Sequence, residues 1–134
     1  MKVHGRCHCG AIAYEAEVDP ARAAVCHCVD CQILSGAPLR ASVPARVEDF
    51  RLLRGTPKAY VKTAESGRRR AQLFCGDCGS PLYSADAEGA QTYTLRIGPM
   101  DERGQLPPRR QIWCESALSW SRGLLELPRT EKQS

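Results

Sequence analysis

The sequence contains no long run of apolar residues and no recognisable targeting segment. No stretch approaches the roughly 20 apolar residues that a membrane-spanning helix requires, and the first four residues do not begin the apolar region of a secretory signal. Both absences argue against a membrane protein and against a secreted scaffold held together by disulfides. We therefore expect a cytoplasmic protein, in which thiols stay reduced and eight cysteines indicate metal binding.

Internal repeats and linkers are also absent, so the 134 residues predict a single domain over 1–134 with a sizeable core. Most segments read as short strands bounded by turn residues, and only residues 32–38 are predicted as a helical turn. This pattern predicts an all-β domain, with a frayed polar tail over residues 128–134. The predicted strands are two around Gly10 within residues 3–18, then 39–43, 47–55, 57–63, 70–75, 82–84 and 92–97.

Three cysteines, Cys26, Cys28 and Cys31, lie within six residues of one another. Alternate residues of a strand point to the same side, so we expect Cys26 and Cys28 to converge and a tight turn to bring Cys31 to the same ion. A disulfide inside this stretch would be strained, because such close neighbours rarely meet its geometry. A tetrahedral Zn²⁺ with Zn–S bonds of about 2.3 Å suits the cluster.

The next four cysteines form two pairs, a C-x-C at Cys7 and Cys9 and a C-x-x-C at Cys75 and Cys78. Together they would close a four-thiolate structural zinc site that ties the first strands to a distant turn. The three-thiolate cluster would then leave one position open on a second zinc, and an open position is typical of catalytic zinc.

Cys114, His8 and His27 are the remaining candidate ligands. Cys114 follows an isoleucine and a tryptophan, and this context favours a small buried thiol over a fourth ligand of the second site. His8 and His27 each lie between two cysteines, so in a strand their side chains would face away from the metal.

Two other classes of zinc protein lack their signatures in this sequence. Nucleobase deaminases use a histidine or cysteine followed two positions later by glutamate, and no such tripeptide occurs. In Cys₂His₂ zinc fingers the ligand pairs lie much closer together than Cys31 and Cys75, which are separated by 43 residues.

The net charge of +4 does not indicate a nucleic-acid partner, because it counts every cysteine as neutral. Seven ligating thiolates would contribute −7 and two Zn²⁺ ions would contribute +4, which leaves +1. Residues 68–70 and 109–110 are short basic runs, which usually form solvated strand ends. The alternative is that they hold an anionic small molecule.

Three cysteine motifs, in this order, give the chain its resemblance to a known family. They are residues 5–10 (Gly-Arg-Cys-His-Cys-Gly), residues 26–32 (Cys-His-Cys-Val-Asp-Cys-Gln) followed by a Ser-Gly at 35–36, and residues 74–83 (Phe-Cys-Gly-Asp-Cys-Gly-Ser-Pro-Leu-Tyr). From about residue 5 to residue 120, the sequence resembles the glutathione-dependent formaldehyde-activating enzyme family, which also contains centromere protein V.

This resemblance implies a β-tent fold of short antiparallel strands and carbon–sulfur lyase chemistry. In that chemistry glutathione is joined to formaldehyde as S-hydroxymethylglutathione. The resemblance also implies two zinc ions per chain, a structural one at Cys7, Cys9, Cys75 and Cys78 and a second at Cys26, Cys28 and Cys31.

A three-thiolate site is chemically suited to a thiol ligand. Three thiolates on Zn²⁺ leave a formal charge of −1, so this metal should activate water less well than zinc held by histidines. A soft thiol is the better fourth ligand, held as thiolate beside a small aldehyde. We therefore predict an enzyme that acts on a thiol–aldehyde adduct, with Cys26, Cys28 and Cys31 as its catalytic residues. The alternative is a non-catalytic zinc module that binds a protein partner or carries a thiol.

Overall fold

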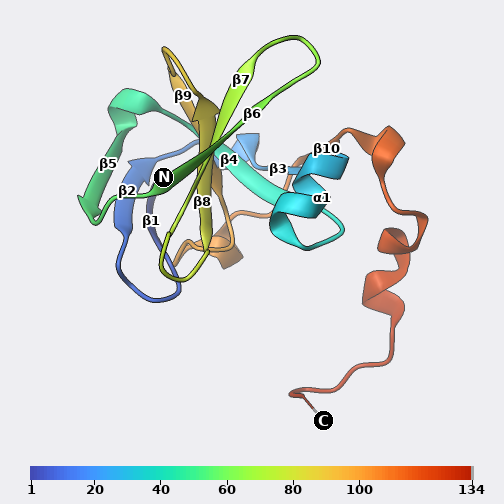
Figure 1. Ribbon diagram of the computed structural model, residues 1–134. Coiled ribbons are helices and arrows are strands. Elements are labelled where there is room, and N and C mark those ends of the chain that lie inside the picture. Colours follow the sequence, from blue (N-terminus) through green and yellow to red (C-terminus); the bar gives the residue numbers. More distant parts are fainter. Residues whose placement is uncertain (134) are drawn as a thin grey trace.

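Two β-sheets make up most of residues 1–133, the part of the chain that this computed structural model describes (Figure 1). The smaller sheet has the strand order β1-β2-β5, with β1 at Lys2–Arg6, β2 at Ala13–Glu17 and β5 at Phe50–Arg54. The larger sheet has the order β10-β3-β4-β9-β8-β7-β6. Its strands are β3 (Ala24–Cys26), β4 (Arg40–Arg46), β6 (Lys58–Thr63), β7 (Arg69–Phe74), β8 (Pro81–Asp86), β9 (Thr92–Arg96) and β10 (Arg110–Ile112).

The mostly β character predicted from the sequence is confirmed, and so is the first pair of strands. β1 and β2 pair antiparallel around a turn in which Gly10 has a left-handed backbone, with a φ of 82°. Glycine adopts this conformation without the steric cost that other residues meet. The inward residues of β2, Tyr14 and Ala16, are buried while their neighbours are more exposed, as the alternating sequence predicts.

Aromatic side chains are scarce in the sequence, at 6%, and four of the eight lie together in the core. The ring of Phe50 packs against the rings of Tyr14 and Tyr83, with centroids 4.9 and 5.0 Å apart, and Tyr83 stacks on Tyr93 at 4.7 Å. These rings come from β2, β5, β8 and β9, so they join the smaller sheet to the larger one. Centroid distances of this kind are favourable for aromatic pairs.

Helix α1 (Val29–Ser35) begins three residues earlier than the helical turn predicted over residues 32–38. Its N-cap is Cys28, whose Sγ accepts a hydrogen bond from the amide of Cys31 at 3.3 Å. The prediction that Cys28 belongs to a strand is therefore wrong, because the thiol caps the helix instead. The predicted end is confirmed, since Gly36 ends the helix in a left-handed conformation, with a φ of 68°.

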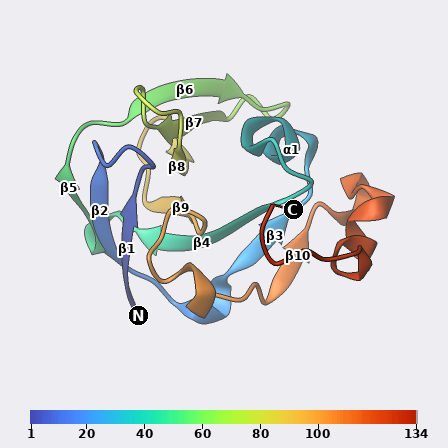
Figure 2. The same cartoon turned by 90° about the horizontal axis from the view of Figure 1, so that it is seen from below.

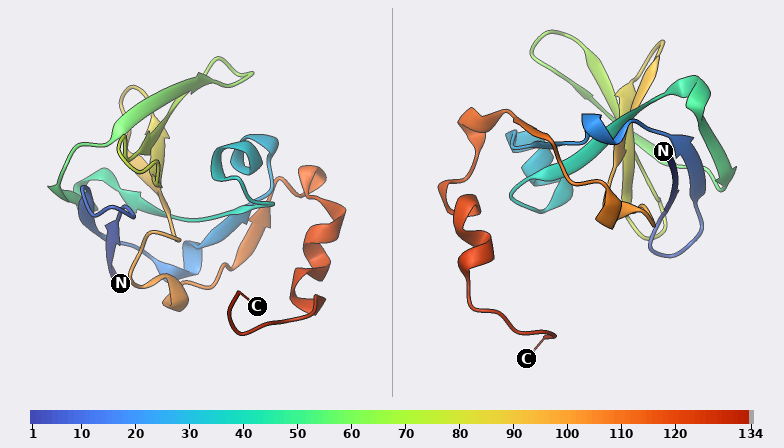
Figure 3. Two further views of the ribbon diagram at one scale, coloured as in Figure 1. Left: turned by 60° about the horizontal axis from the view of Figure 1, so that its bottom comes forward. Right: turned by 180° about the vertical axis from the view of Figure 1, so that it is seen from behind.

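The larger sheet is not purely antiparallel, which corrects the prediction of antiparallel strands. β10 pairs parallel with β3, whereas the other strand pairs of the described chain are antiparallel. After β10, short 3₁₀ segments at Cys114–Ser116 and Ser119–Glu126 extend away from both sheets (Figure 1 and Figure 3). Of the tail predicted over 128–134, residues 128–133 contain no helix or strand and Ser134 lies outside the described residues.

The larger sheet has one apolar and one polar face. Val43 and Leu95 are cross-strand partners on β4 and β9, and both are fully buried in the core. Their sequence neighbours Ser42 and Arg96 also form a pair and point to the opposite face, because side chains alternate along a strand. Figure 2 shows that the sheet curves, so that β6 and β7 lie opposite β3 and β4, with α1 beside the space between them. Ser42 of β4, Gln72 of β7 and Arg96 of β9 line one cavity, so the polar face lies on the concave side.

No helix within residues 1–133 combines the length and the apolar character that crossing a bilayer requires.

Candidate metal centres and the adjoining cavity

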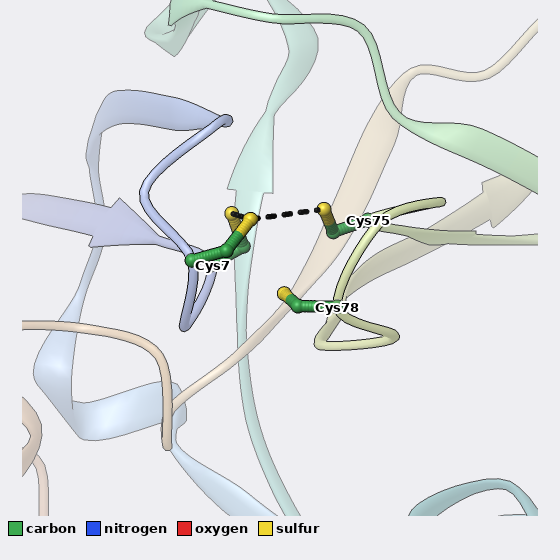
Figure 4. Close-up of side chains that lie close together, drawn as sticks. Cys7, Cys75 and Cys78 are labelled. Carbon is green, nitrogen blue, oxygen red and sulfur yellow. Dashed lines mark hydrogen bonds between the residues drawn. The ribbon is translucent and has the colours of Figure 1, made fainter.

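The first candidate metal centre joins two loops that are distant in the sequence. Cys7 and Cys9 lie in the loop after β1, and Cys75 and Cys78 lie in the loop between β7 and β8 (Figure 4). All four Sγ atoms lie within 4.8 Å of one another, and the four cysteines are free thiols. The Sγ atom of Cys9 is 3.6 Å from that of Cys7 and 3.8 Å from that of Cys75. A tetrahedron with 2.3 Å metal–sulfur bonds has edges of about 3.8 Å, so the spacing fits a zinc ion.

Hydrogen bonds favour the thiolate forms of Cys7 and Cys78 in this cluster. The amide of Ile12 donates to the Sγ of Cys7 at 3.2 Å. The hydroxyl of Ser80 lies 3.2 Å from the Sγ of Cys78 and accepts a hydrogen bond from the amide of His8 at 2.9 Å, so it connects the two loops. The Ser80 hydroxyl, helped by backbone amides, lowers the pKa of Cys78 to about 5. Deprotonated cysteine is the form that binds metal.

The second candidate centre is formed by one short stretch of chain. Cys26 ends β3, Cys28 caps helix α1 and Cys31 lies in the first turn of that helix, with their Sγ atoms within 4.8 Å of one another. The convergence predicted for these three residues is thus confirmed, although a helical turn rather than a strand and a tight turn produces it. Burial raises the pKa of Cys26 to about 12, whereas at Cys28 burial is outweighed by hydrogen bonds from the Cys31 backbone and the neighbouring thiols, which lower the pKa. A bound cation would favour the thiolate form of all three.

The other candidate ligands stand apart from both clusters. Cys114 is exposed, so the prediction of a buried thiol is wrong. It follows Trp113, whose backbone is left-handed with a φ of 58°, in the segment that leaves the sheets. His27 is buried, and its Nε2 lies 2.8 Å from the side-chain oxygen of Gln111. His8 is exposed. None of the three belongs to a metal-type cluster of the described residues.

The three-cysteine cluster lines a cavity of about 440 Å³ on the concave face of the larger sheet. Small-molecule sites commonly have volumes of about 300–1,000 Å³. Most of the charged residues that line this cavity are basic. One carboxylate, that of Asp30, also lines it and pairs with Lys62. The cationic residues that line it are Arg22, Arg40, Lys62, Arg70, Arg96 and Arg110. The cavity therefore combines a soft thiol cluster with an excess of positive charge.

The two basic runs noted in the sequence divide between the cavity and the outer surface. Arg70 and Arg110 line the cavity, whereas Arg68 forms a two-contact ion pair with Asp86 at 2.7 and 2.9 Å. Arg69 pairs with Glu88 and is not among the residues that line the cavity. The solvated-strand-end interpretation therefore holds for Arg68, Arg69, Arg109 and Arg110, which are exposed, although Arg110 also borders the cavity. It is wrong for Arg70, which is partly buried and pairs with Asp86.

Sequence reasoning missed Arg40 and Arg96, the two most buried cations of the cavity. They are 8% and 5% exposed, respectively. A signal was present at Arg96, which lies between the buried residues Leu95 and Ile97 near the end of a strand. A charged residue flanked in this way must point to the other face of the sheet, where it needs polar surroundings.

A family model described as "Glutathione-dependent formaldehyde-activating enzyme" matches residues 2–116. The chain belongs to this family. The match includes both cysteine clusters and ends before the Ser119–Glu126 segment. The resemblance drawn from the three cysteine motifs is thus confirmed.

Two proteins are similar to the chain, the first a relative by sequence and the second a solved structure. A Schizosaccharomyces pombe protein described as an uncharacterized lyase is 28% identical over 97 residues, which cover 68% of this chain and 63% of the relative. The chain thus matches less than two thirds of that relative's length. A crystal structure of a Rhodobacter sphaeroides protein superposes with a TM-score of 0.62 at 23% identity, covering 83% of this chain and 99% of that one. At this identity the second likeness shows a shared fold.

Proposed function

We propose that this member of the glutathione-dependent formaldehyde-activating family is a zinc-dependent carbon–sulfur lyase, which joins a small thiol to an aldehyde. Glutathione and formaldehyde are the first candidates, because the family description names both. The observation that carries the proposal is the position of the three-cysteine cluster, which lies in the wall of a ligand-sized cavity. In this proposal the fold is of the β-tent type and the protein acts in the cytoplasm.

The donor sets of the two clusters suggest different roles. Four thiols from two distant loops fill the coordination shell of a tetrahedral zinc, and such closed sites are structural. Three thiols would leave a bound zinc ion one position for a further ligand, and all three cysteines line the cavity. We therefore assign Cys26, Cys28 and Cys31 to catalysis and the four-cysteine cluster to stability.

The proposed reaction needs no other reactant. The thiol sulfur forms a bond to the aldehyde carbon, the π bond of the carbonyl breaks, and the thiol proton ends on the carbonyl oxygen. Zinc at Cys26, Cys28 and Cys31 would hold the incoming sulfur as a thiolate. The cavity walls would confine the aldehyde beside that sulfur. This confinement would replace a bimolecular encounter in water by a prearranged one.

A non-catalytic zinc module that binds a protein partner is the second candidate. The observation that favours it is the apolar C-terminal segment, in which Trp120 is 57% exposed and Leu125 is 93% exposed. Exposed apolar surface of this kind commonly marks a contact with another molecule. The two candidates differ in whether the zinc-loaded protein turns over a thiol and an aldehyde.

Exchange NMR on the zinc-loaded protein tests the proposal. Glutathione and formaldehyde also form their adduct without a catalyst, and the wild type should accelerate the exchange between free and adduct forms. Cys28→Ser should lose this acceleration, and Cys114→Ser is the matched control, since Cys114 is an exposed thiol outside both clusters. Equal exchange rates with and without the wild-type protein would contradict the enzyme assignment and favour the partner-binding module.

A further inference from the structure

Arg40 and Arg96 are buried cations that no carboxylate of residues 1–133 pairs with. Their exposed fractions are 8% and 5%, and neither forms an ion pair in the described chain. Their neighbour Arg70 differs, because it donates to the carboxylate of Asp86 at 3.1 Å. Buried charges are normally paired, since an unpaired charge loses its hydration without compensation.

The hydrogen-bond partners of these two guanidinium groups are neutral and few. Arg96 donates to the hydroxyl of Ser42 at 2.9 Å and to the side-chain oxygen of Gln72 at 3.1 Å. Arg40 reaches the same Gln72 oxygen at 3.5 Å, and its Nε is buried without any partner. Each guanidinium carries five N–H donors, so most of the donors of this pair have no partner within residues 1–133.

Burying these two guanidinium groups without an anionic partner is energetically unfavourable for the folded protein. Burial, together with the charge of Arg40, lowers the pKa of Arg96 to about 9. Arginine nevertheless stays charged in proteins, so two like charges lie close together in a buried wall of the cavity. A bound anion would offset that cost.

The position of the pair connects it to the three-cysteine cluster. Arg40 on β4 is the cross-strand partner of Cys26 on β3, and both line the cavity with Arg96. Three thiolates with one Zn²⁺ carry a net −1, whereas the two guanidinium groups carry +2. The other two partly buried cations of the cavity, Arg70 and Lys62, have carboxylate partners in Asp86 and Asp30. Arg22 and Arg110 also line the cavity and form no ion pair within residues 1–133, so positive charge remains for both the thiolate and the acid group of a ligand that reaches the cluster.

We infer that Arg40 and Arg96 bind the carboxylate of the thiol substrate, so that the site selects thiols bearing an acid group over neutral thiols. This inference rests on the proposed function, in which the thiol group of the same molecule meets the three-cysteine cluster. Two guanidinium groups in one cavity wall match the two oxygens of a carboxylate, in both charge and hydrogen-bonding capacity.

The test compares two thiols that differ in one end group, 3-mercaptopropionate and 3-mercaptopropan-1-ol. Calorimetric titration of the zinc-loaded wild type should show that the acid binds about tenfold or more tightly than the alcohol, as expected for a charge-assisted pair. Arg96→Gln should remove this preference and leave the affinity for the alcohol within about threefold. Arg69→Gln is the matched control, because Arg69 is an arginine outside the cavity.

The outcomes separate this inference from the proposed function. Equal weakening of both thiols by Arg96→Gln, with wild-type zinc content, would overturn the inference, because the residue would then support the cysteine cluster itself. 3-(Methylthio)propionate, which keeps the acid but has no thiol, provides the second arm. If 3-mercaptopropionate and 3-(methylthio)propionate bind the wild type equally well and neither binds Arg96→Gln, the carboxylate site stands and the proposed function fails. If 3-(methylthio)propionate binds both proteins equally, the carboxylate site fails. Should Arg96→Gln not fold by circular dichroism, Arg40→Gln replaces it in every arm.

Discussion

Gly5 lies on β1 directly against the ring of Tyr14, its cross-strand partner on β2. A Cβ atom built on Gly5 would lie 2.1 Å from the ring, far inside contact distance. The ring cannot move aside easily, because it is 1% exposed and stacks on Phe50. This glycine is therefore required by packing, since its backbone is not among the left-handed positions.

Gly5→Ala should lower the free energy of unfolding by about 1–3 kcal/mol, as overpacking of a filled core does. The control is Gly98→Ala, because a Cβ atom added to Gly98 would have no other atom within 4 Å and its backbone is not left-handed. This second change should stay within about 0.5 kcal/mol of the wild type. Urea unfolding of the zinc-loaded proteins measures both values, and equal stabilities of the two variants would contradict the packing described for Tyr14.

Tyr83 provides a pH-dependent test of the aromatic core. Burial, and then the neighbouring Tyr93, raises the pKa of Tyr83 to about 12, whereas a free tyrosine titrates near 10. The folded protein thus holds this proton more tightly than the unfolded chain does. The resulting stability is fully present below about pH 10 and is lost as the pH rises towards 12.

Tyr83→Phe removes the titrating group and keeps the ring. Between pH 8 and pH 11 the wild type should therefore lose more stability than this variant, as measured by urea unfolding at both values. The same loss in both proteins would mean that Tyr83 ionises in the folded state as freely as it does in the unfolded chain.

At the level of single residues, the sequence predicts the thiols well and the arginines poorly. Cys26, Cys28 and Cys31 are found by their spacing, because a few residues of chain are enough to bring them together. Arg40 and Arg96 lie 56 positions apart and meet only because β4 pairs with β9. The burial of Cys114 is predicted wrongly for a related reason, since it depends on the path of the chain after β10.

At the level of elements, the four-cysteine cluster connects the two sheets. Cys7 and Cys9 follow a strand of the smaller sheet, whereas Cys75 and Cys78 lie between two strands of the larger one. The three-cysteine cluster instead lies within one short connection, from β3 into α1. Loss of a metal should therefore have different consequences at the two clusters.

Cys78→Ser should lose one zinc ion and much of the thermal stability, because it opens the link between the sheets. Cys28→Ser should keep the fold and lose thiol binding. Circular dichroism melts and zinc content by native mass spectrometry measure the difference. Equal damage to the melting transition in both variants would refute the division into a structural and a functional site.

Elements with strong local patterns are predicted best. The β1–β2 pair, β4, β6, β7, β8 and β9 are all predicted, because each carries alternation or flanking turn residues. β10 is missed, since its three residues are all exposed and show no alternating pattern. Its parallel pairing with β3 depends on the path of the whole intervening chain, which local propensities do not contain.

At the scale of the whole molecule, the curvature of the larger sheet forms the cavity of the candidate site. It brings the polar faces of β4, β7 and β9 around one cavity and sets the three-cysteine cluster in its wall. The cavity is basic overall, and in the account proposed here its walls hold an anionic thiol while the cysteine cluster holds the sulfur.

The measurement that tests this account most directly is a titration of the zinc-loaded protein with glutathione and with S-methylglutathione. Both compounds carry the same two carboxylates, but only glutathione can offer a thiolate. We predict that glutathione binds about tenfold or more tightly, and that its affinity rises with pH while deprotonation of the thiol limits binding. Equal affinity for the two compounds would contradict the proposal that the sulfur binds at Cys26, Cys28 and Cys31.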